Sequence, residues 1–501
     1  MCPCRVGHTV SMDTATLEQL LASQPGAPRR GFNAVRTTGI YCRDGCAGRP
    51  RAHNVTRYPT AVAAEAAGYR PCLLCRPDRL PDRTTSPHEM VERALVLITA
   101  GTLDEETEDA LAARLGVTSR HLRRLFQEHV GATPAFVARS RRAHFARRLL
   151  DETDLRITDV AGASGFASVR QMNRVMRDVF RFTPAELRSR RRQRDRLVAD
   201  GGLRLRVPFE GHLAFEELLA YLRPRAIPGV EVVEGGTYRR TTSTHGEPGA
   251  IEVSRPSDTH DERHLQVVAH LPAWTTLIDD VARVRRLFGL DTPPAEATPL
   301  AEDPLLAPSI EARPGLRVPG AWDPFETAVR VYLGQQISVS RATNLAGRLV
   351  EAFGQPVAGL QELGLTHVFP SAAAIADASV EDVRSIGLTV ARARAIREFA
   401  LAYVEERIHL DAAAPLDEAT QALEALPGVG PWTAQMVALR AMGHRDAFPA
   451  GDLGLRRNAG PLLGETDALD AGALEELAER WRPHRALAAL HLWVGGSSAG
   501  G

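Results

Sequence analysis

The spacing of apolar positions changes along the chain. From about residue 86 to residue 190, apolar side chains recur every three to four positions in several stretches, which predicts amphipathic helices. A helix is also predicted over 215–222, and residues 320–495 show a helical pattern rich in Ala and Leu. Between these regions the pattern alternates, which predicts strands at 203–207, 251–253 and 265–268.

The length of 501 residues exceeds what one hydrophobic core organises, so three to four domains are expected. The formal net charge is zero and says nothing about partners. The charge is unevenly spread, however, because residues 111–196 hold twenty Arg against eight Asp and Glu. This excess favours a phosphate-facing surface over the alternative of a solvated helical face. The chain contains no lysine, which excludes a lysine Schiff base.

No apolar run reaches the roughly 18 residues that span a membrane. The first residues lack the pattern of a signal peptide, so we expect a cytoplasmic protein with reduced thiols and no membrane partner. Its six cysteines then indicate metal binding or reactivity rather than disulfides. Cys2 and Cys4 are interpreted as part of a loose tail, or the true start is Met12; additional reactive thiols are the alternative.

The other four cysteines form two close pairs, C-x3-C and C-x2-C, which are Cys42 with Cys46 and Cys72 with Cys75. Two such pairs predict one tetrahedral Cys4 zinc site. The spacing alone leaves open whether this zinc is only structural.

The residues around these pairs, 32–43 and 67–77, resemble the N-terminal domain of Ada-type adaptive-response proteins, and the resemblance spans about 13–80. It implies that Cys42, the first cysteine, accepts a methyl group from a methylated DNA phosphate. Zinc keeps such a thiol deprotonated at neutral pH. Methylation changes the charge of a Cys4 zinc site from about minus two to about minus one, which weakens repulsion from DNA. The Pro-Cys-His-Arg motif of the O6-alkylguanine methyltransferase is absent.

Two helix-turn-helix patterns follow, with turns at Gly116 and at Gly165, and a basic helix predicted over 139–150 joins them. Any helical hairpin can imitate one such pattern, but the tandem pair resembles the AraC-type DNA-binding domain. By that resemblance the second helix of each motif enters a major groove, where side chains contact bases or phosphates. The candidate DNA contacts are Ser119, Arg120, Arg123, Ser168, Arg170, Gln171 and Arg174.

An Arg-rich segment, 189–202, is a predicted linker. After it, residues 225–231 and 238–241 resemble the N-terminal domain of AlkA-type 3-methyladenine glycosylases. No catalytic constellation is visible in this part, so we expect it to be scaffold.

The sequence Leu-Pro-Gly-Val-Gly at 426–430 has the pattern of a helix-hairpin-helix turn. Gly428 and Gly430 permit a tight turn whose backbone N–H groups bind a DNA phosphate, although many glycine-rich turns are only connections. With the segments 322–326, 333–339, 447–455 and 481–493, this turn resembles the helix-hairpin-helix glycosylase superfamily, and AlkA within it. The resemblance implies a candidate monovalent cation at the hairpin.

The same resemblance implies that Asp452 is the catalytic carboxylate. A carboxylate beside C1′ stabilises the positive charge of the breaking N-glycosidic bond and orients water. The predicted base pocket, where cation–π attraction would favour a charged lesion, contains Trp432, Trp493, Gln335 and Met436. Core packing is the alternative for both tryptophans, and Met436 departs from the aromatic residue of AlkA-like enzymes, which affects the lesion range.

Two residue types that related glycosylases use are missing here, which limits the chemistry that we predict. Bifunctional relatives carry a lysine at the position of Trp432, so we predict a monofunctional glycosylase without a lysine lyase step. No cysteine follows Cys75, so we predict no iron–sulfur cluster.

The predicted fold is multidomain and mainly α. It comprises a small zinc-bound α+β domain, two helix-turn-helix units, a small antiparallel α/β domain and an all-α glycosylase domain, at 13–82, 86–190, 203–310 and 311–497.

The predicted function combines excision of alkylated bases such as 3-methyladenine with methyl-triggered transcription regulation. The alternatives are a regulator whose glycosylase-like half only binds DNA, and a glycosylase whose N-terminal part is only a DNA anchor. The predicted partners of this monomer are alkylated and promoter double-stranded DNA, with RNA polymerase as a further candidate. The sequence leaves open the lesion spectrum, the operator and whether both activities act together.

Overall fold

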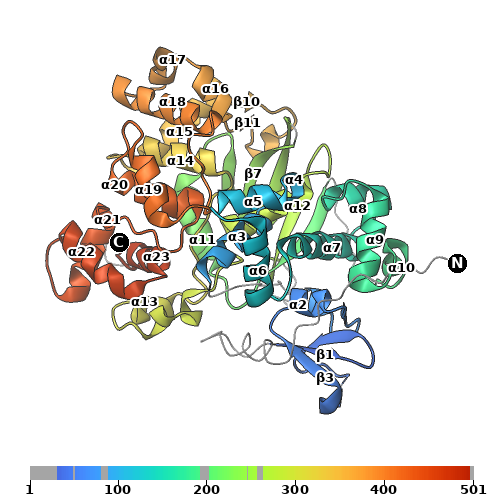
Figure 1. The fold of residues 1–501 in the computed structure, drawn as a ribbon. Coiled ribbons are helices and arrows are strands. Elements are labelled where there is room, and N and C mark those ends of the chain that lie inside the picture. Colours follow the sequence, from blue (N-terminus) through green and yellow to red (C-terminus); the bar gives the residue numbers. More distant parts are fainter. Residues whose placement is uncertain are drawn as a thin grey trace. The chain divides into compact units, whose positions relative to one another are not determined.

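The computed structural model describes residues 31–48, 51–79, 88–191, 202–244, 246–256 and 263–496. Figure 1 shows the helices and strands of the chain in sequence colours. The chain forms two compact units: unit 1 extends to Val198 and includes Ala273–Ala282, and unit 2 contains the rest. The multidomain, mainly α fold predicted from the sequence is confirmed. Cys2, Cys4, Met12 and most of the predicted linker 189–202 lie outside the described residues.

The first described part of unit 1 is a four-stranded sheet in the order β3-β1-β2-β4. Its strands are β1 (Phe32–Val35), β2 (Ile40–Arg43), β3 (Val55–Tyr58) and β4 (Arg70–Pro71). Helix α2 (Ala61–Ala66) starts at Thr60, whose hydroxyl oxygen accepts a hydrogen bond from the Ala63 N–H at 3.1 Å. Strand β2 pairs antiparallel with β1 and parallel with β4, so the two segments that carry the cysteine pairs lie side by side.

The remainder of unit 1 is a set of helices that contains both predicted helix-turn-helix motifs. The first motif is α5 and α6, the second is α8 and α9, and α7 joins them. Gly116 and Gly165 adopt φ values of +72° and +71° in the two turns, a conformation that glycine takes without strain. The helices are α3 (Glu89–Thr99), α4 (Thr102–Glu105), α5 (Glu108–Arg114), α6 (Ser119–His129), α7 (Pro134–Glu152), α8 (Ile157–Ala163), α9 (Val169–Phe180) and α10 (Pro184–Ser189).

The joining helix α7 is longer than the predicted 139–150. It begins five residues earlier, at Pro134, because Thr133 caps its N-terminus and proline suits the first helical position. Its C-terminal residues Asp151 and Glu152 are buried, so packing in unit 1 extends the helix beyond the apolar pattern.

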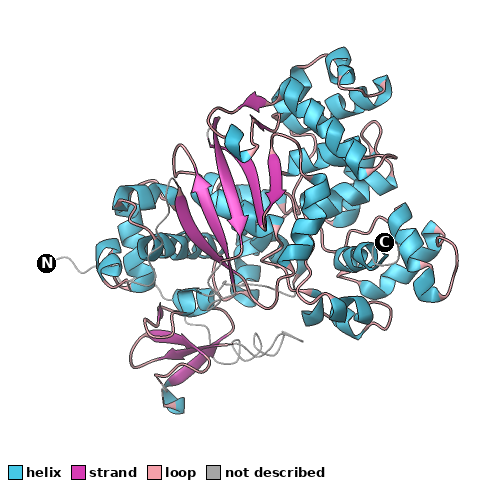
Figure 2. Ribbon diagram, turned by 180° about the vertical axis from the view of Figure 1, so that it is seen from behind, coloured by secondary structure: helices cyan, strands magenta, loops and turns pink. Residues whose placement is uncertain are grey.

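Unit 2 contains a five-stranded antiparallel sheet in the order β5-β9-β8-β7-β6, which Figure 2 shows face-on. The three strands and the helix predicted in this region are confirmed. Alternate residues of β5, such as Leu205 and Val207, are buried, which explains the alternation in the sequence. The elements are β5 (Leu203–Pro208), α11 (Phe215–Leu222), β6 (Glu231–Glu234), β7 (Thr237–Thr244), β8 (Glu247–Ser254) and β9 (His264–His270).

The remaining elements of unit 2 are mainly helices around one apolar core, in which the rings of Phe325 and Tyr332 both contact Phe399. Helix α12, whose first residues belong to unit 1, leads into this part. A π-helix at Ala438–Met442 continues α20. None of the described helices is long and apolar enough to cross a membrane. The elements are α12 (Leu277–Leu287), α13 (Ala307–Ala312), α14 (Pro324–Leu333), α15 (Val339–Phe353), β10 (Gln355–Pro356), β11 (His367–Val368), α16 (Ala372–Asp377), α17 (Val380–Ser385), α18 (Val390–Val404), α19 (Leu416–Glu424), α20 (Pro431–Val437), α21 (Leu453–Ala459), α22 (Ala471–Ala478) and α23 (Arg485–Gly496).

Candidate functional site

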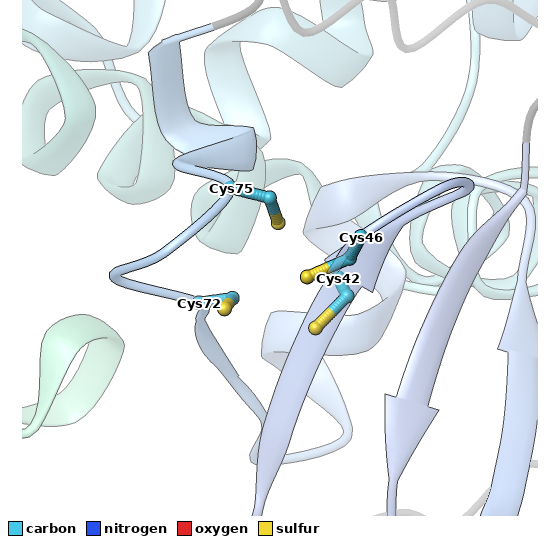
Figure 3. A group of neighbouring side chains, drawn as sticks. All are labelled: Cys42, Cys46, Cys72 and Cys75. Atoms are coloured by element: carbon cyan, nitrogen blue, oxygen red, sulfur yellow. The ribbon is translucent and has the colours of Figure 1, made fainter. Parts of the chain in front are cut away.

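The two cysteine pairs converge at one edge of the four-stranded sheet. Cys42 lies on β2 and Cys46 follows in the next turn, while Cys72 and Cys75 occupy the loop after β4 (Figure 3). The Cys72 N–H donates to the carbonyl oxygen of Tyr41 at 3.0 Å, which fixes the second pair beside the first. All four sulfur atoms lie within 4.8 Å of one another. Cys42 is buried, and the other three cysteines are half-buried.

Four thiols at this distance compete for protons. The hydrogen bond to Cys75, together with burial and neighbouring thiolates, raises the pKa of Cys42 far above its ordinary value. The hydrogen bond that Cys75 accepts from Cys42 lowers the pKa of Cys75 to about 5. A bound divalent cation removes this competition, because all four sulfurs can then be thiolates. A tetrahedral set of four sulfurs suits Zn²⁺.

The cysteine cluster is connected to α7 through Glu65 of α2. The fully buried side chain of Glu65 accepts a hydrogen bond from the hydroxyl of Tyr41, next to Cys42, at 2.7 Å. Its second oxygen accepts from the Ser140 hydroxyl at 2.6 Å, and the His144 Nε2 atom lies 2.6 Å from the first. Buried polar groups need such partners, so this contact fixes the four-stranded sheet against the joining helix.

A second connection starts from the other cysteine pair. Arg76 follows Cys75 directly, has a φ of +46°, and forms ion pairs with Asp78 and Asp151. All three side chains are buried, and the pKa of Asp78 is held below its usual range by the Arg76 guanidinium despite burial. Sequence reasoning missed the roles of Glu65, which lies outside the quoted motifs, and of Arg76, which lies within the segment 67–77, because only the folded chain shows their burial and partners.

In unit 2, Asp452 lies at the N-cap of α21 with both carboxylate oxygens engaged. Oδ1 accepts hydrogen bonds from the Trp493 Nε1 at 2.9 Å and from the Leu455 N–H at 3.0 Å. Oδ2 accepts from the Trp432 Nε1 at 3.1 Å. Both tryptophans are half-buried and pack against the core. The structure therefore brings Asp452, Trp432 and Trp493 together and orients the carboxylate through two indoles.

The neighbouring glycines restrict the space around this carboxylate. A methyl group on Gly454 would lie 3.0 Å from Asp452 Oδ1 and 3.5 Å from the Trp493 ring. Met436 is half-buried against the same core, one turn after Trp432. Of the predicted base-pocket residues, Trp432 and Trp493 therefore contact the carboxylate directly, whereas Met436 packs against the core.

Gln335 contacts the hairpin directly. Its side-chain amide donates to the Gly428 carbonyl oxygen at 2.9 Å and to the Thr433 hydroxyl at 3.0 Å. Gly428 has a φ of +77°, and Gly430 caps α20 with nothing within 4 Å of the position a Cβ would occupy. The hairpin therefore presents open backbone at the start of α20, and Gln335 supports it.

The candidate contacts of the helix-turn-helix motifs divide into two groups. Arg120, Arg170 and Arg174 are exposed. Among the described residues, no side-chain hydrogen bond or ion pair is found for these three arginines. The second group already has partners within the protein: Arg123 pairs with Glu108 at 2.5 Å, the Ser168 hydroxyl accepts from the Gln171 N–H, and the Gln171 side chain accepts from the Ala167 N–H. Ser119 belongs to neither group and is the first residue of α6, after the N-cap Thr118.

The chain matches four families along its length. They are the metal binding domain of Ada at residues 15–78, a helix-turn-helix domain at 111–190, the AlkA N-terminal domain at 204–323, and the HhH-GPD superfamily of base excision DNA repair proteins at 329–483. The first match and the four converging sulfurs together support a Zn²⁺ site. The second and fourth matches support DNA binding.

Curated relatives match the whole chain or its parts. A probable bifunctional transcriptional activator/DNA repair enzyme AlkA of Mycobacterium tuberculosis is 41% identical over 92% of each chain. DNA-3-methyladenine glycosylase 2 of Escherichia coli is 30% identical over 55% of this chain and 92% of its own. The bifunctional transcriptional activator/DNA repair enzyme Ada of E. coli is 32% identical over 31% of this chain and 43% of its own. Among solved structures, a 3-methyladenine DNA-glycosylase from Archaeoglobus fulgidus matches with a TM-score of 0.50 and 27% identity, covering 58% of this chain and 97% of that one.

Proposed function

Because the chain belongs to the family of the bifunctional transcriptional activator/DNA repair enzyme AlkA, we propose that it combines two reactions on alkylated DNA. It excises alkylated bases such as 3-methyladenine, and it accepts a methyl group from a DNA methylphosphotriester on Cys42. The second reaction switches on sequence-specific DNA binding. The arrangement of Asp452 between two indoles is the observation that carries the first activity, and the four converging sulfurs carry the second.

Excision breaks the N-glycosidic bond of a cationic base. The bonding electrons leave with the base, which becomes neutral, and positive charge develops at C1′ of the sugar. The carboxylate of Asp452 stabilises this charge and orients the water that adds to C1′, and the proton of that water leaves to solvent through the carboxylate. The two indole N–H groups keep the carboxylate in place through the reaction.

The test of excision is the release of free 3-methyladenine from methylated duplex DNA. The variant Asp452→Asn should lose about 100- to 1000-fold in rate, because an amide cannot stabilise the cationic sugar. Asp470→Asn is the matched control, since Asp470 caps α22 as Asp452 caps α21 but lies outside the site. Equal activity of both variants would remove Asp452 from the catalytic role, whereas no release by a folded wild type that binds DNA would favour the regulator whose glycosylase-like half only binds DNA.

Methyl transfer forms a carbon–sulfur bond and breaks a carbon–oxygen bond. The Cys42 thiolate attacks the methyl carbon, and the phosphotriester leaves as an ordinary phosphodiester anion. Cys42, Cys46, Cys72 and Cys75 would hold the zinc, which would keep the Cys42 sulfur deprotonated at neutral pH. The product sulfur of Cys42 is a thioether and no longer a thiolate nucleophile, so each molecule accepts one methyl group.

Mass spectrometry after exposure to methylphosphotriester DNA should place one methyl group on Cys42. A methyl on another cysteine would contradict the assignment of Cys42 as the acceptor, and no methyl at all would leave the zinc with a structural role. If a Cys42 variant that retains zinc still activates transcription after alkylation, the N-terminal part is only a DNA anchor. None of these outcomes bears on the release of 3-methyladenine, so methyl transfer and base excision are tested independently.

The remaining assignments complete the proposal. We assign the four domains to 13–82, 86–190, 203–310 and 311–497, with promoter contacts from the second helix of each helix-turn-helix motif. The excision site acts without a lyase step, so abasic DNA should accumulate without strand cleavage. RNA polymerase contact, a monovalent cation at the hairpin and a monomeric state stay predictions.

A further inference from the structure

Asn458 connects the helix of the proposed catalytic carboxylate with the helix of Trp493. It lies on α21, six positions after the N-cap residue Asp452. Its half-buried side-chain amide donates to the carbonyl oxygen of Leu492 at 2.9 Å and to that of Trp493 at 3.4 Å. Helix α21 therefore holds Trp493 at two points, because the Trp493 indole N–H also donates to Asp452.

The turn of α23 that carries Trp493 needs support from other elements. Trp493 lies in the last described turn of this helix, which extends to Gly496 and also contains Gly495. Glycine weakens a helix because it loses more backbone freedom than other residues. Carbonyl groups near the C-terminal end of a helix also depend on side chains or water for hydrogen bonds. The backbone of Trp493 therefore keeps a fixed position through contacts with other helices.

A second side chain binds the same turn of α23 from another helix. The hydroxyl of Ser309 on α13 donates to the carbonyl oxygen of His491 at 3.3 Å and lies 3.2 Å from the Nδ1 atom of that residue. Ser309 and Asn458 together thus bind three consecutive carbonyl groups, those of residues 491–493. The two contacts differ in one respect: Asn458 comes from the helix that begins at Asp452, whereas Ser309 does not.

We propose that Asn458 is a positioning residue for base excision, which holds Trp493 so that its indole N–H meets the carboxylate of Asp452. This inference rests on the proposed excision reaction, in which the indoles orient that carboxylate. Because α21 carries both Asp452 and Asn458, a displacement of this helix moves the carboxylate and the Trp493 backbone together. The hydrogen bond between indole and carboxylate therefore depends on one short helix, which keeps its geometry constant through the reaction.

Two substitutions remove the amide donor in different ways. Asn458→Asp keeps the size of the side chain but places a carboxylate against the carbonyl oxygens of α23, which repel it. Asn458→Ala removes the donor without adding charge, and it replaces the first variant if the carboxylate unfolds unit 2. The matched control is Ser309→Ala, which removes a hydrogen bond to the same turn from the other side. Urea unfolding establishes that each variant is folded.

The first measurement is kcat and KM for release of 3-methyladenine, in a double-mutant cycle with Trp493→Phe. Asn458→Asp should lower kcat about 10-fold at nearly constant KM, the loss expected when the indole hydrogen bond itself is removed. In the Trp493→Phe background it should cost no more than about twofold, since the N–H that it positions is already absent. Ser309→Ala should retain the wild-type kcat. Losses that multiply in the double variant, or a wild-type kcat in both Asn458 variants, would overturn the positioning role.

The second measurement does not depend on activity. It is the solvent exchange rate of the Trp493 indole N–H, followed by NMR on protein labelled at the indole nitrogens, with Trp493→Phe to assign the signal. Exchange should be about 10-fold faster in both Asn458 variants than in wild type and Ser309→Ala, because the protecting hydrogen bond opens more often. Equal exchange rates in all four proteins would contradict the proposal. If a folded wild type releases no base, the proposed excision fails instead, and the exchange rates still decide whether Asn458 positions Trp493.

Discussion

The two candidate reaction sites differ in what holds the reactive group. Cys42 meets three other thiols that come from two neighbouring segments, and four sulfur atoms at this distance suit a bound cation. Asp452 receives hydrogen bonds from Trp432 and Trp493, which lie 20 and 41 positions away in the chain on other helices. A metal holds the first site together, whereas packed helices hold the second.

This difference suits the two reactions. The proposed methyl transfer changes the charge of the Cys42 site permanently, so this site reacts once and does not have to return to its starting state. The proposed excision returns Asp452 to the same state after each cycle, which a rigid set of protein hydrogen bonds achieves. The comparison leads to four predictions, from the largest effect to the smallest.

Removal of zinc with a strong chelator should abolish methyl transfer to Cys42 while release of 3-methyladenine continues. The reason is that thiols without a cation share protons, and metal binding contributes the folding energy of such small sites. Both activities are measured on one sample, with zinc added back as the control. Loss of base release together with methyl transfer would show that the two sites depend on each other.

Trp432→Phe and Trp493→Phe keep an aromatic ring but remove the N–H that donates to Asp452. Each should lower kcat for base release about 10-fold, since a hydrogen bond to a charged group contributes about 1.5 kcal/mol. KM should change little if the indoles orient the carboxylate. A rise in KM at constant kcat would show instead that the rings serve only the base pocket.

Gly454→Ala should lower base release several-fold and raise thermal stability. The new methyl group would lie 3.0 Å from Asp452 Oδ1 and displace it, whereas alanine in place of glycine in a helix stabilises by roughly 0.5–1 kcal/mol. Gly495→Ala on α23 is the control, because its nearest neighbour, the Ser309 hydroxyl, is 3.9 Å away. Unchanged activity of Gly454→Ala would mean that the carboxylate tolerates displacement.

Acid should destabilise unit 2 through His491. Burial lowers the pKa of His491 to about 4, so the unfolded chain, with an ordinary histidine pKa of about 6.5, binds the proton first. The free energy of unfolding should therefore fall by about 3 kcal/mol as the pH falls from 6.5 to 4, and not fall further from this group below that range. Urea unfolding at several pH values measures this change. His491→Gln should flatten the pH dependence, and an unchanged dependence would contradict the assignment.

Local pattern predicted much of the fold. The strands at 203–207 and 265–268 and the helix at 215–222 follow from alternation and helical spacing, because burial on one face dictates those periods. The start of α7 at Pro134 did not follow from apolar spacing, since a capping threonine and a proline determine it. The four cysteines were predictable from their spacing alone, because short gaps between thiols leave few ways to place them.

The sequence by itself determined which residue types are available for chemistry: four paired thiols, one carboxylate after a hairpin, and arginine as the only basic side chain besides histidine. Only the tertiary structure decided which of these groups meet. It placed both indole N–H groups on Asp452, turned the Gln335 amide to the hairpin carbonyl, and brought Arg70 and Arg190 to the Phe182 ring. The physical reason is that spacing along one chain segment sets local turns and ligand pairs, whereas contacts between distant segments depend on how helices and sheets pack.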